Sequence, residues 1–331
     1  MRLPESLRNA IRDESAGIDP ATLARAAFQL SEFYKDGQYT KAALNGKASR
    51  LAYLQVRMPA TYAANLRVFR EIRERTRAIP IRSVLDLGAG PGTAMWAASE
   101  VFPEVERFTL VERDGELIEI GRRLAYGSAI EAVRSARWVR QDLASAPEIE
   151  CHDLTVISYA LGELSPSTAA GLLRMAWSRT SSVLAIIEPG AVRNFETVLA
   201  ARSALIDLSA NVVAPCPHDR QCPMAAAGDW CHFSQRLERT GEHRRLKAAS
   251  LGYEDEKFSY FVAAKLRSEL PDSRIVRHPL KHSGHVQLTL CTPEGLQRAT
   301  IGKAKKQQYR LARKAEWGNA WQRSSQLNHP E

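Results

Sequence analysis

A short apolar segment that runs into a glycine-rich turn constrains the fold of this chain more than any other feature. Residues 83–88 are SVLDLG, a composition typical of a buried strand, and the turn AGPG at 89–92 follows at once. Glycines let the backbone turn tightly and approach a ligand closely, and a helix beginning near Thr93 offers free amide donors at the same place. Strand, glycine turn and helix in this order predict a nucleotide site at the edge of a parallel sheet.

The chain beyond residue 81 alternates short apolar runs with helical segments. The runs typical of buried strands are 83–88, 107–113, 136–143, 153–159 and 182–190. Strands separated by helices predict a parallel sheet covered on both faces, hence an α/β fold. Residues 191–256 do not follow this alternation of strands and helices and are expected to form an insertion. Two further apolar runs, 257–266 and 285–292, are expected to complete the same sheet.

The first 80 residues are typical of a helical region. Asp19 followed by Pro20 predicts a helix start, and Leu23, Ala27 and Leu30 then share one face. A second helix is expected over residues 61–77. No apolar run approaches the roughly 18 residues that a membrane span requires, so we expect no membrane association.

Basic residues are in excess and gather at one end of the chain. There are 46 Lys and Arg against 37 Asp and Glu, for a net charge of +9, which favours polyanionic partners such as RNA. Residues 296–331 hold two acids, Glu316 and Glu331, and are predicted to form an RNA-binding tail. Their basic residues are Arg298, Lys303, Lys305, Lys306, Arg310, Arg313, Lys314 and Arg323.

Acidic residues stand at three successive predicted strands. Asp86 precedes the first glycine by two, Glu112 ends the second strand and Asp142 ends the third. A dinucleotide fingerprint needs its third glycine where Thr93 stands, which disfavours a dehydrogenase. S-adenosylmethionine instead needs a carboxylate for its ammonium group, an acid for its ribose and a polar group at its adenine. The candidate cofactor-binding residues are Asp86, Gly88, Gly90, Gly92, Glu112 and Asp142.

The segment after the fourth strand does not identify a catalytic residue. Residues 158–164 are SYALGEL, which is neither the loop of amino-group methyltransferases nor a site with a nucleophilic cysteine. Glu163 is either a base or a polar residue at the rim, and the rim is favoured. Cys151, just before the fourth strand, is expected to be a small buried residue rather than a nucleophile.

Three of the five cysteines lie close together, at Cys216, Cys222 and Cys231, and Cys291 ends the last predicted strand. Four thiolates suit either zinc or an iron–sulfur cluster. Zinc sites more often use two tight cysteine pairs, which these spacings lack, whereas a proline directly after a cysteine is typical of iron–sulfur loops. The pattern therefore favours a [4Fe-4S] cluster over zinc. His218, His232 and His243 could each replace a cysteine, but with four thiols available they are interpreted as neighbours of the site or as RNA-facing residues.

Several of these motifs together resemble one known family. The motifs are DLGAGPG at 86–92, SYALGEL at 158–164, IEPG at 187–190, CPHDRQCP at 216–223, WCHFSQRLER at 230–239, KHSGHVQLTLC at 281–291 and YRLARKAEWGNAW at 309–321. The chain resembles the methyltransferase-like, Rsm-type assembly factors of the small ribosomal subunit, known in mitochondrial and bacterial forms. The cysteine loop and the tail carry most of the resemblance, since unrelated methyltransferases share the glycine turn.

The resemblance implies a class I S-adenosylmethionine methyltransferase fold over 81–295, with a helical region at 1–80, the cysteine-rich insertion at 191–256 and the basic tail at 296–331. It also implies binding to maturing small-subunit rRNA, S-adenosylmethionine at the glycine turn and an iron–sulfur cluster on the four cysteines. The protein is expected to be monomeric off the ribosome.

The alternative function is an active rRNA methyltransferase with a structural zinc or iron–sulfur site. A radical enzyme is disfavoured because that chemistry uses three close cysteines and leaves one iron open. The absence of a recognisable leader at the start predicts the bacterial cytoplasm, with the mitochondrial matrix as the alternative.

Overall fold

A central sheet organises the protein. The computed structural model describes residues 1–35, 44–77, 79–145, 149–247 and 250–322. Its main sheet has the strand order β3-β2-β1-β4-β5-β8-β6, and β7 extends it by pairing with β8. The strands are β1 (Ser83–Leu87), β2 (Arg107–Glu112), β3 (Arg137–Arg140), β4 (His152–Ser158), β5 (Thr180–Pro189), β6 (Asn211–Ala214), β7 (Phe233–Glu238) and β8 (Tyr253–Ala264).

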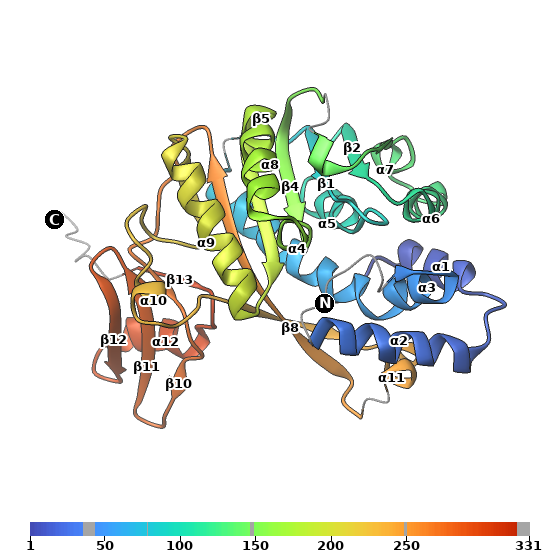
Figure 1. Cartoon of the computed structure of the whole chain (residues 1–331). Coiled ribbons are helices and arrows are strands. Elements are labelled where there is room, and N and C mark those ends of the chain that lie inside the picture. The colour runs from blue at the N-terminus through green and yellow to red at the C-terminus, as the bar shows by residue number, and fades with distance from the viewer. Residues whose placement is uncertain (36–43, 78, 146–148, 248–249, 323–331) are drawn as a thin grey trace.

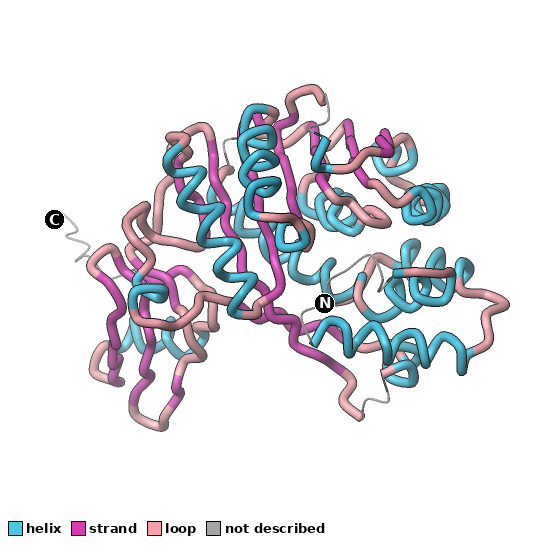
Figure 2. Tube along the Cα trace, viewed as in Figure 1, coloured by secondary structure: helices cyan, strands magenta, loops and turns pink. Residues whose placement is uncertain are grey.

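Strands β1 to β5 are parallel, and β8 runs antiparallel to β5, β6 and β7. With the first strand at the centre and a reversed strand next to the edge, this is the α/β sheet of class I methyltransferases, as the sequence predicts. Helices pack on both faces (Figures 1 and 2). They are α5 (Thr93–Val101), α6 (Gly115–Tyr126), α7 (Glu131–Arg134), α8 (Pro166–Ser178) and α9 (Val192–Asp207).

Four helices precede the sheet: α1 (Glu5–Glu14), α2 (Pro20–Lys35), α3 (Lys47–Val56) and α4 (Met58–Arg75). The Asp19 side chain accepts a hydrogen bond from the Thr22 amide at 2.9 Å, which confirms the predicted helix start. Residues of all four helices share one buried core with β1, β2, β4 and β5. Within the described ranges, no helix is both long enough and apolar enough to cross a bilayer.

The expectation that residues 191–256 form an insertion is wrong for their first part. Helix α9 continues the alternation, and β6 joins the sheet beside β8. Strand β6 is only four residues long, so its apolar run is too short to stand out in the sequence. What departs from the regular pattern is residues 215–252, which contain the cysteine loop, α10 (Pro223–Ala226), β7 and α11 (Gly241–Leu246).

The expectation that residues 285–292 complete the main sheet is also wrong, because β8 and β6 already do so. The segment is β11 (His285–Thr292) of a second, five-stranded sheet, which we call the small lobe and which lies apart from the main sheet in Figure 1. Its other strands are β9 (Ser273–Ile275), β10 (Leu280–Lys281), β12 (Gly295–Gly302) and β13 (Ala320–Trp321), and α12 (Lys306–Lys314) packs on it.

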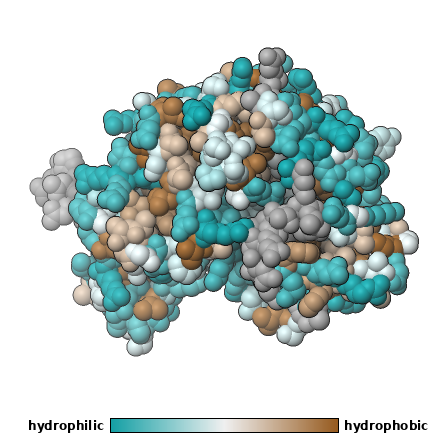
Figure 3. Space-filling model, viewed as in Figure 1, coloured by the Kyte–Doolittle hydropathy of each residue, from teal (hydrophilic) through white to brown (hydrophobic). Residues whose placement is uncertain are grey.

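The described part of the predicted basic tail, residues 296–322, is therefore part of this small lobe. It begins within the β11–β12 hairpin, and α12 buries Ala312 against the apolar face of the sheet while Arg310, Arg313 and Lys314 stay exposed. Arg323 and Glu331 lie outside the described residues. Figure 3 shows hydrophilic residues over much of the small lobe.

One buried arginine joins the small lobe to the rest of the molecule. Arg274 of β9 is 1% exposed and donates to three separate segments: the Pro215 carbonyl at 2.7 Å, the Gly318 carbonyl at 2.9 Å and Glu71 Oε1 of α4 at 2.8 Å. Although burial raises the pKa of Glu71, Arg274 and two further arginines hold it below its ordinary value, so the pair is ionic.

We expect Arg274→Met to destabilise the protein by about 3–5 kcal/mol, because it leaves the buried Glu71 carboxylate without its closest partner. Urea denaturation measures the change. Arg298→Met, at an exposed arginine of strand β12 in the same sheet, is the control and should stay within about 0.5 kcal/mol of the parent. Equal effects of the two substitutions would contradict the role given to Arg274.

Candidate functional site

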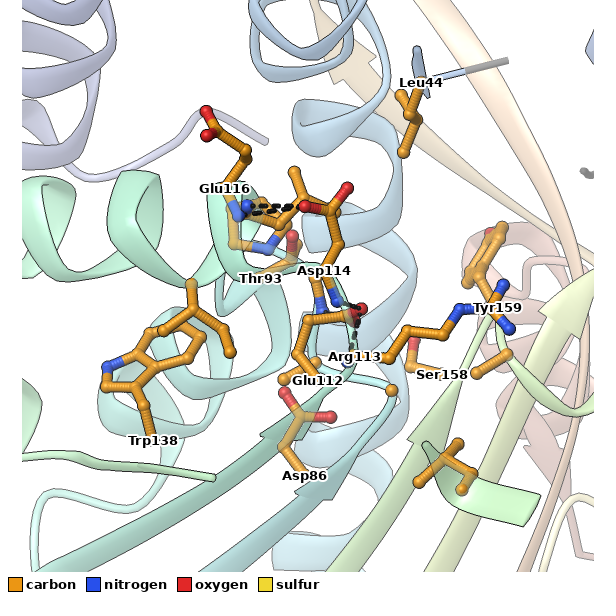
Figure 4. A pocket seen from close by; sticks show the side chains of 18 of the residues that line it. Leu44, Asp86, Thr93, Glu112, Arg113, Asp114, Glu116, Trp138, Ser158 and Tyr159 are labelled. Carbon is orange, nitrogen blue, oxygen red and sulfur yellow. Dashed lines mark hydrogen bonds between the residues drawn. The ribbon is translucent and has the colours of Figure 1, made fainter. Parts of the chain in front are cut away.

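A cleft of about 740 Å³ opens at the carboxyl edge of the main sheet. We call it the cofactor cleft. The ends of β1 to β4 line it from the sheet side, and residues of α3 and α4 line it from the helical side. Figure 4 shows Asp86 below Glu112, with Arg113 extending toward Ser158 and Tyr159. Carboxyl ends of parallel strands are the usual ligand sites of such sheets.

The predicted glycine turn forms the floor of the cleft. Gly88, Gly90 and Gly92 all have positive φ, the left-handed region that favours glycine. A Cβ on Gly88 would stand 2.6 Å from the Ala160 Cβ, which is too close, whereas a Cβ on Gly90 would meet nothing within 4 Å. The turn therefore packs tightly on one side and leaves open space on the ligand side at Gly90.

Asp86 is the buried acid of the cleft. It is 2% exposed, and its Oδ2 has no hydrogen-bond partner among the described residues. Burial, together with the neighbouring Glu112, raises the pKa of Asp86 to about 8. An orphaned buried carboxyl oxygen that lines a cleft fits a cationic group of a ligand, such as an ammonium.

Glu112 is held by the backbone of two turns. Its Oε2 accepts from the Gly90 amide at 2.9 Å, and its Oε1 accepts from the amides of Arg113 at 2.8 Å and Asp114 at 2.9 Å. Each carboxylate oxygen has spare acceptor capacity, so the group can still take hydroxyl donors from a ligand. The amides fix its orientation toward the turn.

Asp142 and Glu163 both stand near the guanidinium of Arg113 at the mouth of the cleft. Arg113 lies 3.7 Å from Asp142 Oδ2 and 3.8 Å from Glu163 Oε2. The Asp142 side chain is 45% exposed, and its Oδ1 accepts from the Ala144 amide at 3.0 Å. The structure thus brings five of the six predicted cofactor residues to the lining of one cleft, while Gly92 stands in the same turn between the lining residues Pro91 and Thr93. Glu163 occupies the rim of the cleft, which was the favoured interpretation.

The helical side of the cleft was not predicted. Arg50 of α3 forms an ion pair with Asp114 at 2.9 Å, and Tyr53, Thr61 and Asn65 also line the cleft. Asn65 is fully buried and its Oδ1 has no partner among the described residues. Nothing in the local sequence marks these residues, because they reach the cleft only through the packing of α3 and α4.

The segment after β4 is tightly constrained. Tyr159 has a φ of 57°, rare for a non-glycine residue, and its hydroxyl donates to Glu256 Oε1 of β8 at 2.9 Å. Arg57 also contacts Glu256, at 3.2 Å. Glu188 accepts from the Leu161 and Gly162 amides, and burial raises its pKa to about 7. These bonds hold the loop at the wall of the cofactor cleft, which Ser158, Tyr159 and Ala160 line.

A second cavity contains all four predicted metal ligands, and we call it the cysteine cavity. Cys216 follows β6, Cys222 precedes α10, Cys231 precedes β7 and Cys291 belongs to β11 of the small lobe. Burial, together with the neighbouring cysteines, raises the pKa of Cys231 and Cys291, that of Cys291 to about 12. The four sulfurs are therefore close enough to influence one another.

Two buried arginines also line the cysteine cavity, Arg274 and Arg202 of α9. Arg202 is 5% exposed and donates to the carbonyls of His218 at 3.0 Å and Arg220 at 2.7 Å, while its Nε has no partner. No described carboxylate forms an ion pair with it. His218 Nε2 lies 3.6 Å from the Cys291 sulfur. Sequence patterns do not reveal either arginine.

Cys151 corrects another expectation. It is exposed rather than buried, in the segment before β4, and its sulfur lies 3.8 Å from the Ser178 carbonyl. It lines neither the cofactor cleft nor the cysteine cavity. Among the described residues, no group of three or more His, Cys, Asp or Glu side chains is arranged to hold a single metal ion.

Residues 47–322 match the family described as mitochondrial small ribosomal subunit Rsm22. The chain belongs to the Rsm22 family. The ribosome assembly protein METTL17, mitochondrial, of Homo sapiens is 28% identical over 287 aligned residues, and the match covers 81% of this chain and 61% of that protein. The Rsm22-cox11 tandem protein 2, mitochondrial, of Schizosaccharomyces pombe is 27% identical over 328 residues, 81% of this chain and 42% of that protein.

This Rsm22 family member thus spans less than two thirds of the length of either relative. Solved methyltransferase structures are more distant. The magnesium protoporphyrin IX methyltransferase of Synechocystis PCC 6803 is 9% identical with a TM-score of 0.43, covering 72% of this chain and 93% of that chain. The fold assignment rests on the strand order of the main sheet rather than on this likeness.

We expect Asp86→Asn to change how stability depends on pH. The pKa of Asp86 is raised in the folded state, so the folded protein holds a proton that the unfolded chain releases between about pH 4 and pH 8. Stability therefore falls as pH rises through this window, and the variant should lose that contribution.

Relative to the parent, the unfolding free energy of Asp86→Asn should rise with pH by up to about 1.4 kcal/mol per unit. Urea denaturation at pH 5, 6, 7 and 8 measures it. Asp142→Asn, at the exposed mouth of the same cleft, is the matched control. Parallel pH profiles of parent and Asp86→Asn would refute the prediction.

Proposed function

We propose that this protein is an assembly factor that binds the rRNA of the maturing small ribosomal subunit, with S-adenosylmethionine in the cofactor cleft and a [4Fe-4S] cluster in the cysteine cavity. The observation that carries the proposal is the meeting of Cys291, from the small lobe, with three cysteines of a distant loop. Membership of the Rsm22 family and the names of the relatives support the ribosomal role.

The cofactor cleft supports the S-adenosylmethionine part of the proposal. The orphaned Asp86 oxygen suits the ammonium group, Glu112 suits the ribose hydroxyls and Asp142 suits the adenine edge. Bound there, S-adenosylmethionine supplies an activated methyl group. The residues of the chain bind and orient it and close the cleft from the side of α3 and α4.

The cysteine cavity supports the metal part of the proposal. Its four thiols suit either zinc or a cluster, and the wide spacing of Cys216, Cys222 and Cys231 in the sequence, with a proline after two of them, favours a [4Fe-4S] cluster. Arg202, a buried cation with no acid partner, suits a cavity whose thiolates and metal together carry negative charge.

The small lobe supports the RNA part of the proposal. The exposed cations of α12 stand on a folded element that is tied to the core through Arg274. Basic side chains on a rigid surface suit phosphate contacts. We further propose a monomer off the ribosome. The cytoplasmic location stays a prediction, while the relatives named above are mitochondrial, which supports the mitochondrial alternative.

Methyl transfer to rRNA is the second candidate function, favoured by the intact cofactor cleft. Incubation with methyl-labelled S-adenosylmethionine and immature small subunits tests it, with Asp86→Ala as the control. Label transferred by the parent and not by the control would establish activity. The loop after β4, held by Tyr159, Glu256 and Glu188, offers no recognised catalytic base, so we expect binding without transfer.

The cluster is tested by comparing Cys291→Ser with Cys151→Ser. Anaerobically purified parent should contain about four iron and four sulfide per chain with the visible absorbance of a cluster. Cys291→Ser should lose most of both, because the small lobe then supplies no thiolate. Cys151→Ser removes an exposed thiol away from the cavity and should retain them. Zinc in place of iron in the parent would contradict the proposal.

The RNA surface is tested by the double variant Arg310→Gln and Lys314→Gln on α12. Affinity for small-subunit rRNA should fall, and the slope of log affinity against log salt should decrease in magnitude by about 0.7–0.9 per lost phosphate contact. Arg122→Gln, an exposed arginine of α6, serves as the control for net charge. An unchanged slope in the double variant would remove α12 from the interface.

A further inference from the structure

A third cavity, of about 480 Å³, lies apart from the two sites already described. It is bounded by α1, the end of α3, the start of α4, the end of β7 and α11. It shares no lining residue with the cofactor cleft. Adjacent residues separate the two: Tyr53 and Thr61 line the cleft, while Leu54 and Tyr62 line this cavity.

The lining of this cavity is strongly basic. Five arginines and two glutamates contribute to it: Arg2, Arg8, Arg12, Arg239, Arg245, Glu238 and Glu242. Two of the arginines are neutralised, since Arg2 pairs with Glu238 and Arg239 pairs with Glu254. The other three form no ion pair with a described residue. We call this cavity, with Arg8, Arg12 and Arg245, the arginine cavity.

Arg8 provides the strongest evidence for a ligand in this cavity. Its Nε is buried and has no hydrogen-bond partner among the described residues. A buried guanidinium nitrogen that lacks an acceptor is costly unless a ligand supplies one. Arg12 makes one long contact, 3.5 Å to Asn9, so its guanidinium also remains available. Both belong to consecutive turns of α1 and face the same cavity.

The remaining lining residues indicate the size and polarity of the part of the ligand that does not contact the arginines. Ile11, Leu54, Tyr62 and Leu237 provide apolar walls. His243 is 2% exposed and its Nε2 has no hydrogen bond; burial lowers its pKa to about 4, so the ring is neutral at pH 7. The volume exceeds what inorganic phosphate fills and lies in the range of small-molecule sites.

We propose that the arginine cavity binds a nucleotide unit through its phosphate, with Arg8, Arg12 and Arg245 holding the phosphate and the apolar walls holding the rest. Guanidinium groups match phosphate oxygens in pairs, which makes arginine the preferred side chain for this chemistry. The nucleotide is either free or part of an RNA strand. The site does not depend on the function proposed for the other two cavities.

Calorimetric titration of the full chain with uridine monophosphate tests the site, because uridine avoids the adenosine determinants of the cofactor cleft. The parent should bind, and saturating S-adenosylmethionine should not displace the nucleotide. Arg8→Gln and Arg12→Gln should each weaken binding by about tenfold or more. Arg25→Gln, an exposed arginine of α2 that bonds only Thr22 among the described residues, should leave it unchanged.

Because Arg8 is half-buried, the exposed Arg12 supplies the decisive variant if Arg8→Gln fails to fold. Absence of binding by the parent, displacement by S-adenosylmethionine, or equal affinity of parent and Arg12→Gln would each overturn the proposal. A 5′-phosphorylated oligouridine distinguishes the sources: competition with uridine monophosphate assigns the site to an RNA strand, and its failure to compete assigns it to a free nucleotide.

Discussion

The buried guanidinium of Arg274 is the interaction on which the rest of the arrangement depends. It is the only described side chain that donates at once to α4, to the segment after β6 and to the segment before β13. The bond to Gly318 lies within the small lobe, and the bonds to Pro215 and Glu71 dock the lobe against the rest of the molecule. Docking places β11, and with it Cys291, at the cysteine cavity. A buried ion pair fixes how two elements dock more reliably than it adds folding stability. The cysteine cavity requires this fixed docking, because one of its cysteines comes from the small lobe.

The cofactor cleft and the cysteine cavity bury groups of opposite charge type. In the cofactor cleft a carboxyl group is buried without a partner, so the cleft suits a cation. In the cysteine cavity a guanidinium is buried without an acid, so that cavity suits an anionic assembly of thiolates and metal. An unpaired buried group of either kind costs free energy, and a ligand group of opposite charge offsets that cost. The sign of the buried group at each site therefore limits the charge of the ligand that the site can stabilise.

The sequence predicts those parts of the fold that local patterns determine. Asp86, Glu112 and Asp142 could be placed together because ends of neighbouring parallel strands meet at one edge. Strand β6 was missed because four residues carry too little periodicity, and β11 was assigned to the wrong sheet because an alternating run does not say which partner it pairs with. Sheet membership depends on contacts between distant segments.

The dependence on contacts between distant segments also explains which site residues the sequence did not reveal. Arg50, Arg202 and Arg274 act through packing between elements far apart in the chain, and nothing near them in the sequence marks this. Cys151 was expected to be buried because free cysteines usually are, yet it stands in an exposed segment ahead of β4. All four cysteines of the cavity were grouped from the sequence, but that Cys291 reaches the cavity on a separate lobe, rather than on a strand of the main sheet, was not predicted.

Strand β8 connects the cofactor cleft with the cysteine cavity. It is long enough to pair with β7 at one end and with β5 and β6 at the other. Along it, Glu256 receives the Tyr159 hydroxyl beside the cofactor cleft, and Ser259 donates to the Cys231 carbonyl at 2.9 Å beside the cysteine cavity. A shift of one residue in its alignment would turn both side chains to the opposite face. An insertion or deletion at the start of this strand would therefore displace contacts at both sites at once.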